Sequence, residues 1–181
     1  MSPADRAGRA RRARPGARAK GPAPLTHLAP DGSARMVDIG EKPVTRRTAT
    51  AVARVAMSAP VLAAALAGDG PKGEVLGTAR IAAIQAAKRT SELVPLCHPI
   101  RLDEITVGFE PDRARGVLVV HTRACATDRT GVEMEALVAA TTAALVIYDM
   151  TKALDKATSI ESVQLVEKTG GKSGDWRRPA S

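Results

Sequence analysis

The sequence predicts an α+β fold in which an antiparallel sheet has helices packed on one face. Some segments place apolar residues at every second position, as strands do, and others repeat them at helical spacing. Leaving out one additional helix, these elements follow the order β-α-β-β-α-β. This order is the ferredoxin-like split βαβ pattern. At 181 residues the chain is long enough for a single domain with its own core.

The first half of the domain is expected to contain one strand and two helices. Residues 48–57 (TATAVARVAM) alternate with period two and predict a strand. Residues 58–68 (SAPVLAAALAG) have a serine cap, an early proline and a final glycine, so they predict a short helix. A turn-rich loop at 68–74 exposes Lys72. A second helix is predicted over 78–94, where a proline follows.

The second half supplies the rest of the sheet and the longest helix. Residues 104–110 and 116–126 alternate and are joined by PDRAR, which predicts an antiparallel hairpin. From Gly131 to about Asp155 the chain is nearly all apolar, so we expect a long and largely buried helix. A last strand is predicted over 160–168.

The first 24 residues form a basic segment without large apolar side chains after the initial methionine. Before position 21 there are seven basic residues and one acidic residue, whereas the whole chain has a net charge of +8. We expect a disordered tail over 1–24. Attraction to nucleic acid or anionic surfaces is one interpretation, and an extension without a dedicated role is the favoured one. The segment lacks the apolar stretch of a secretory signal.

Composition excludes some classes of function. Only 2% of residues are aromatic, which argues against a platform that stacks nucleic-acid bases. No uninterrupted apolar run is long enough to cross a bilayer, so no membrane partner is expected. Cys97 and Cys125 are isolated from one another, which favours a reduced, cytoplasmic setting.

The glycine-rich stretch LVEKTGGKSGDW contains a Gly-Lys-Ser triplet that resembles the end of a phosphate-binding P-loop. Such a loop needs a glycine five positions before Gly171, where this chain has Val166. It also needs a following helix, for which too few residues remain. We therefore expect residues 169–175 to be a flexible anion-binding flap without P-loop geometry.

Two short motifs have both structural and functional interpretations. His98 lies between prolines in PLCHP, so its backbone is restricted, and the residue types leave open whether it binds a ligand or is simply hydrogen-bonded. Cys97 beside it does not make a convincing metal pair, and no metal is expected. In RTGVEMEAL, Glu133 and Glu135 begin the long helix, where the positive end of the helix dipole stabilises carboxylates. Met134 between them would be a core residue by default.

Charged residues further along are candidates for catalysis and anion binding. Asp149 and Lys152 are three residues apart and share a helix face, so their pKa values should be coupled. A triphosphate needs cations from several segments, and Lys72, Lys168 and Lys172 could supply them. Further basic candidates are Arg46, Arg47, Lys88 and Arg89.

Together these segments resemble the cyclic pyranopterin monophosphate synthase family of molybdenum cofactor biosynthesis, known as MoaC. The resemblance covers nearly everything from residue 25 to 176. It rests on the strings LTHL, RMVDIGEKPVTRR, TARIAAIQAAKRTSELVPLCHP, RTGVEMEALVAATTAALVIYDMTKA and EKTGGKSGDW.

The resemblance implies a synthase domain over 25–176 and a short C-terminal tail over 177–181. It implies a ferredoxin-like homohexamer, a trimer of dimers with active sites at the dimer interface. It also implies conversion of 3′,8-cyclo-7,8-dihydro-GTP to cyclic pyranopterin monophosphate with release of pyrophosphate. No cofactor is implied, although a divalent ion such as Mg could accompany the triphosphate.

The resemblance also assigns residues. Its catalytic positions match Lys72, Asp149 and Lys152, and its substrate-binding positions match Leu96, Cys97, His98, Met134 and Glu135, with Glu133 beside them. Basic positions suited to the triphosphate match Arg47, Lys168 and Lys172. The chain departs from the family pattern at Asp128, Glu161 and Thr169.

The expected chemistry combines proton transfers on the ring with displacement of pyrophosphate. We expect Asp149 and the surrounding cations to depress the pKa of Lys152 toward neutrality, so that it exchanges protons with the substrate. Glu133 and Glu135 are expected to accept paired hydrogen bonds from the N–H donors of a guanine-like edge.

Two competing interpretations of the whole chain are a nucleic-acid-binding module and a non-catalytic paralogue. The intact set of catalytic residues argues against the paralogue.

Overall fold

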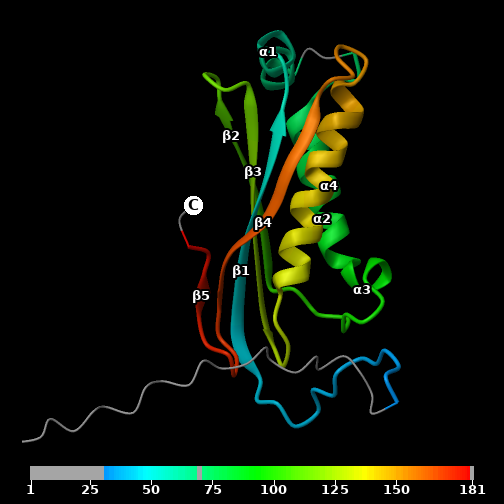
Figure 1. Cartoon of the computed structure of the whole chain (residues 1–181), viewed down its shortest axis with the longest axis vertical. Helices are drawn as coiled ribbons and strands as arrows, with labels where there is room; N and C mark the ends of the chain where they lie inside the picture. The colour runs from blue at the N-terminus through cyan, green and yellow to red at the C-terminus, as the bar shows by residue number, and fades with distance from the viewer. Residues whose placement is uncertain (1–30, 69–70, 180–181) are drawn as a thin grey trace, which may run out of the picture.

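A computed structural model describes residues 31–68 and 71–179 as one α+β domain (Figure 1). The predicted tail over 1–24 lies outside these residues. The elements are β1 (Thr45–Ala56), α1 (Ala59–Ala67), α2 (Val75–Lys88), α3 (Thr90–Leu93), β2 (Glu104–Asp112), β3 (Val117–Asp128), α4 (Glu133–Thr151), β4 (Ser159–Thr169) and β5 (Trp176–Arg177).

The five strands form one antiparallel sheet in the order β2-β3-β1-β4-β5. The two strands joined through α1 and α2, β1 and β2, are not neighbours, because β3 lies between them. This is the split βαβ arrangement that the order of elements predicts. Helices α2 and α4 run antiparallel to one another across one face of the sheet (Figure 1).

The core is built mainly from alanine. On β1, Ala49, Ala51 and Ala53 are fully buried, and they alternate with partly exposed residues as predicted. They lie beneath α4, whose buried face is also rich in alanine, so the helix can approach the sheet closely. Bulk is supplied by a few larger side chains such as Leu118 and Ile147, which are fully buried.

The predicted helix over 78–94 is divided in the structure. Helix α2 starts earlier, because the Glu74 side chain caps it by accepting a hydrogen bond from the backbone N–H of Gly77 at 2.5 Å. It ends at Lys88, where Arg89 leaves the helical conformation with φ −115° and ψ 17°. The single turn α3 follows it.

Other boundaries also differ from the prediction, and β1, for example, begins at Thr45 rather than at residue 48. Helix α4 is shorter at both ends than the predicted 131–155. The short strand β5 was not predicted; it pairs with the end of β4, joining Lys168 to Trp176 and Glu167 to Arg177. The boundary expected after Trp176 therefore falls inside a strand.

Among the described helices, α4 is long and apolar enough by length and composition to cross a membrane. Half of that span is buried within the domain, against the sheet and α2, as in the central helix of a folded core. Its two ends point in opposite directions along the long axis of the molecule (Figure 1). Both ends bear predicted site residues, with Glu133 and Glu135 in the first turn and Asp149 in the last.

Candidate active site

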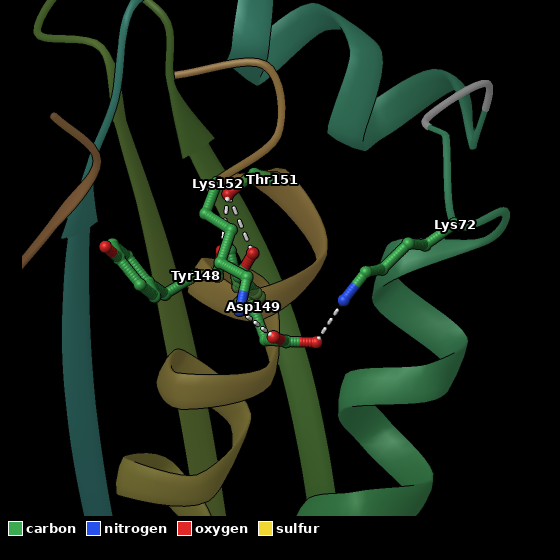
Figure 2. A network of polar contacts seen from close by, with 6 residues as sticks. Lys72, Tyr148, Asp149, Thr151 and Lys152 are labelled. Carbon is green, nitrogen blue, oxygen red and sulfur yellow. Dashed lines mark hydrogen bonds and ion pairs between the residues drawn. The ribbon is translucent and has the colours of Figure 1, made fainter. Parts of the chain in front are cut away.

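At the C-terminal end of α4, two lysines share one carboxylate (Figure 2). Lys72 Nζ lies 2.6 Å from Asp149 Oδ2, and Lys152 Nζ lies 2.7 Å from Asp149 Oδ1. Lys72 comes from the loop before α2, whereas the other two residues belong to the last turn of α4 and the residue after it. The antiparallel packing of α2 on α4 brings them together. All three side chains are about half exposed.

The ion pairs set the protonation states of this cluster. Hydrogen bonds from Lys152 and then Lys72 lower the pKa of Asp149 to about 2. The hydrogen bond to Asp149 raises the pKa of Lys152. Our expectation that the pKa of Lys152 is depressed toward neutrality is therefore wrong for the single chain, because the adjacent carboxylate stabilises the ammonium form. The cluster is a carboxylate flanked by two cations.

The opposite end of α4 borders a pocket of about 310 Å³. One wall is the first turn of α4, with Glu133, Met134 and Glu135, and another is the segment after α3. A third wall comes from the chain before β1. The segment after α3 contributes Leu96, Cys97 and His98, and the chain before β1 contributes Val37, Ile39 and Lys42. Six of the predicted substrate-binding residues thus line one pocket, namely Leu96, Cys97, His98, Glu133, Met134 and Glu135.

Glu135 is the buried acid of this pocket. Its side chain is only 3% exposed, and its Oε2 has no hydrogen-bond partner among the described residues. Burial raises the pKa of Glu135 to about 7, and the negative charges of Glu133 and Asp128 add to the effect. Asp128, where the chain departs from the family pattern, therefore contributes to the electrostatics of the pocket. Burial also raises the pKa of the Cys97 thiol.

A second pocket of about 640 Å³ adjoins the first and is rich in cations. The two share Lys42, Thr130, Gly131 and Glu133 as lining residues, so they lie side by side, and the pair is called the groove. The basic residues that line the second pocket are Lys42, Arg47, Arg129, Lys168 and Lys172. Glu133 is its one acidic lining residue among those described, and its carboxylate lies 3.8 Å from Lys168 Nζ.

The glycine tail closes one side of the cationic pocket. Gly170 and Gly171 have φ values of +82° and +78°, a conformation that favours glycine. A Cβ on Gly170 would collide with the Arg46 carbonyl, and one on Gly171 with the Arg47 guanidinium. Lys168 donates a hydrogen bond to Ser173 Oγ within the same turn. Glycine here lets the tail backbone press against the start of β1.

Arg47 is held at the floor of this pocket. Its side chain is 8% exposed, and its Nε donates a 2.9 Å hydrogen bond to the Asp128 carbonyl. One guanidinium edge is therefore anchored to β3, while the other lies against Gly171 and the pocket. A buried arginine of this kind is suited to binding a phosphate through paired N–H donors.

The other basic candidates lie outside the groove. Arg46 is exposed on the opposite side of β1, since strand side chains alternate. Arg89 pairs with Glu92 at 2.8 Å, and Lys88 is exposed at the end of α2. Sequence reasoning did not single out Lys42 or Arg129. Lys42 lies in RMVDIGEKPVTRR and Arg129 in RTGVEMEAL, but neither residue was assigned a role.

Within residues 31–68 and 71–179, no group of three or more His, Cys, Asp or Glu side chains could hold a metal ion. The cationic groove itself favours an anionic ligand, and the carboxylates at its other end favour N–H donors.

Comparison with known proteins identifies the family of the chain. The protein-family model described as the MoaC family matches residues 36–171 of this chain. The cyclic pyranopterin monophosphate synthase of Chloroflexus aurantiacus is 52% identical over 155 residues, which cover 86% of this chain and 95% of the relative. The protein of the same name from Brucella ovis is 52% identical over 152 residues, which cover 84% of this chain and 92% of the relative. The matched region contains the cluster at the end of α4 and most of the groove, and the chain belongs to the MoaC family.

Proposed function

We propose that this chain is a cyclic pyranopterin monophosphate synthase, a lyase of molybdenum cofactor biosynthesis. Its substrate would be 3′,8-cyclo-7,8-dihydro-GTP. The observation that supports this most directly is the groove, in which a carboxylate pocket adjoins a cationic pocket. A guanine-derived ring presents N–H donors that suit the carboxylate pocket, and a triphosphate has the negative charge that suits the cationic pocket.

In this proposal the groove binds and orients the substrate. Glu133 and Glu135 accept hydrogen bonds from the N–H edge of the ring. Arg47, Lys168 and Lys172 neutralise the triphosphate, with Lys42 and Arg129 beside them. Leu96, Cys97, His98 and Met134 enclose the ring. Fixing both ends of the substrate places the α-phosphate near the ribose-derived hydroxyl.

The chemical step needs proton transfer and charge stabilisation. The hydroxyl attacks the α-phosphate and gives its proton to a general base, the bond from the α-phosphorus to the oxygen shared with the β-phosphate breaks, and pyrophosphate leaves with that electron pair. Lys72 and Lys152 are suited to donate protons or to stabilise the negative charge, because Asp149 keeps Lys152 in its ammonium form. Glu135, with a pKa of about 7, is the group best matched to exchange a proton near neutral pH.

One chain cannot bring all these residues to a single substrate. Met134 and Asp149 are fifteen residues apart in α4, so a rise of 1.5 Å per residue separates them by about 22 Å. We therefore propose that each active site combines the groove of one copy with the Lys72–Asp149–Lys152 cluster of another. On the family resemblance alone, we further propose that the copies form a homohexamer, a trimer of dimers. We also propose that the enzyme is cytoplasmic and needs no cofactor, although a Mg ion could bind together with the triphosphate.

The direct test is to supply purified protein with 3′,8-cyclo-7,8-dihydro-GTP. We expect release of one pyrophosphate per substrate and a pterin with a cyclic phosphate, identified by mass spectrometry. If the substrate is bound but not converted, the chain would be a non-catalytic paralogue. If it is neither bound nor converted, the groove has been assigned to the wrong ligand.

Complementation tests the shared site. A Lys152→Ala chain and a His98→Ala chain should each be inactive, while their co-purified mixture should regain about a quarter of the wild-type activity, since random pairing gives one site in four with both halves intact. If the mixture stays inactive although mixed oligomers form, the site lies within one chain.

A further inference from the structure

Residues 169–175, the glycine turn, form the loop of a hairpin that β5 closes. The chain reverses direction after β4, so that Lys168 lies opposite Trp176 in the antiparallel pairing (Figure 1). Just beyond β5, the backbone N–H of Arg178 donates a 2.8 Å hydrogen bond to the Val166 carbonyl. The two ends of the turn are therefore held side by side at the edge of the sheet.

A carboxylate joins the two sides of this turn from within. Asp175 Oδ1 accepts a 3.0 Å hydrogen bond from the backbone N–H of Gly170, five residues earlier. The Gly174 N–H donates a second hydrogen bond across the turn, to the Gly171 carbonyl at 3.1 Å. All three glycines have positive φ, and a chain rich in glycine has many conformations of similar energy. The contacts across the turn therefore select the conformation that it adopts.

The conformation of the turn determines the shape of the second pocket. Residues 168–173 all line this pocket, whereas Asp175 does not. Gly171 lies so close to the Arg47 guanidinium that a Cβ on it would collide with that group. A change in the path of the turn would therefore move Lys172 relative to Arg47, and the cations would no longer converge on one ligand.

The charge of Asp175 opposes the binding of an anion. The residue is exposed and only three positions from Lys172, beside a pocket that we assign to phosphates. Its negative charge repels such a ligand. A benefit of Asp175 to phosphate binding must therefore come from the hydrogen bond to Gly170, and this difference in sign separates the two effects by experiment.

We propose that Asp175 is a positioning residue of the triphosphate site, whose carboxylate holds the glycine turn so that Lys172 and Ser173 stay at the wall of the second pocket. The inference rests on the proposed function and adds a residue that acts on the phosphates through the turn. A turn that is ordered before the ligand arrives does not have to be ordered on binding, which would cost free energy.

Two substitutions of Asp175 separate geometry from charge. Asparagine keeps an oxygen that can accept the Gly170 N–H but has no charge, whereas alanine removes both the acceptor and the charge. We expect Asp175→Ala to weaken the binding of pyrophosphate by about fivefold, the scale of one hydrogen bond. Asp175→Asn should bind pyrophosphate at least as tightly as the wild type. Calorimetric titration measures both affinities.

Steady-state turnover of 3′,8-cyclo-7,8-dihydro-GTP gives a second measurement. Asp175→Ala should raise KM about fivefold and leave kcat within twofold, because it weakens binding and leaves the reacting groups in place. Asp175→Asn should restore KM. The matched control is Asp112→Ala, since Asp112 accepts a 3.1 Å hydrogen bond from the Arg115 backbone N–H beside another hairpin loop, outside the groove. This variant should change neither constant.

Hydrogen exchange tests the turn without any ligand. In the free protein the Gly170 amide should exchange severalfold faster in Asp175→Ala than in the wild type, because its acceptor is lost. In Asp175→Asn it should exchange at the wild-type rate. Equal exchange in all three proteins would show that Asp175 does not hold the turn, and would overturn the inference.

The titrations distinguish failure of this inference from failure of the proposed function. Tighter binding of pyrophosphate by both variants, equal losses in both, or unchanged binding by Asp175→Ala would overturn the role of Asp175. In each of these cases the wild type binds pyrophosphate, so the proposed function stands. If the wild type does not bind pyrophosphate, the second pocket is not the phosphate site, and both proposals are wrong.

Discussion

Burial of Glu135 in the groove should make the stability of the folded chain depend on pH. Its carboxyl has a pKa of about 7 in the folded chain and an ordinary value of 4.5. The unfolded chain therefore binds fewer protons between these pH values, and stability falls as pH rises from about 4.5 to 7. Above pH 7 the full cost of the buried charge is present, and below 4.5 it is absent.

Replacement of Glu135 by glutamine should remove this cost. At pH 8 the Glu135→Gln protein should exceed the parent in free energy of unfolding by up to about 3 kcal/mol, and at pH 4.5 the two should differ little. Urea unfolding at equal protein concentration, at both pH values, measures the difference. An advantage of the same size at both pH values would show that the charge of Glu135 is not its source.

The lysines of the cluster are expected to affect turnover rather than folding. Both are about half exposed, so Lys72→Ala and Lys152→Ala should leave the fold intact while kcat falls by about a hundredfold or more, as for loss of a general acid. Lys156→Ala is the matched control, since this exposed lysine lies four residues further on and lines none of the pockets described above. Turnover within a few-fold of wild type in either cluster variant would refute their catalytic role.

At the scale of elements, the sequence patterns predicted the strands and helices whose residues are determined by burial of one face. The alternation in β1 and the apolar run of α4 identified these elements, because burial on one face dictates their residues. The start of α2 was missed because Glu74, not a serine or threonine, caps it. Strand β5 was missed because two residues show no periodicity, and only pairing with β4 makes them a strand.

The sequence predicted most residues of the candidate site, but it did not predict how they are arranged in space. Spacing alone placed Asp149 and Lys152 on one face of a helix. The contact of Lys72 with Asp149 depends on how α2 packs on α4, which no local pattern encodes. Lys42 was missed because a single lysine before a strand is common, and its position becomes informative only when two pockets meet beside it.

The glycine turn after β4 should control phosphate binding through Arg47. A methyl group on Gly171 would displace the guanidinium, so Gly171→Ala should weaken binding of pyrophosphate by about tenfold, which is ~1.4 kcal/mol. Gly174→Ala is the matched control, because its φ of +68° imposes similar backbone strain while its Cβ would meet nothing within 4 Å. Calorimetric titration measures both. Equal losses would assign the effect to backbone strain instead of Arg47.

At the scale of the whole molecule, the N-terminal basic segment is expected to be dispensable for catalysis. The family match begins at residue 36, and every proposed site residue follows it. Removal of residues 1–22 should leave kcat and KM within twofold, since the groove and the cluster are unchanged. Fluorescence anisotropy with a labelled oligonucleotide tests the competing interpretation. Loss of turnover would give the segment a catalytic role, and strong binding that disappears with the segment would favour a nucleic-acid-binding module.

A shared active site also makes activity depend on assembly. An isolated chain has a groove and a cluster about 22 Å apart along α4, so it should bind substrate anions without converting them. Specific activity should therefore fall on dilution below the dissociation constant of the dimer, while pyrophosphate binding per chain changes much less. Stopped-flow dilution followed by mass photometry relates the two quantities. Activity per chain that stays constant while monomers predominate would mean that one copy holds the complete site.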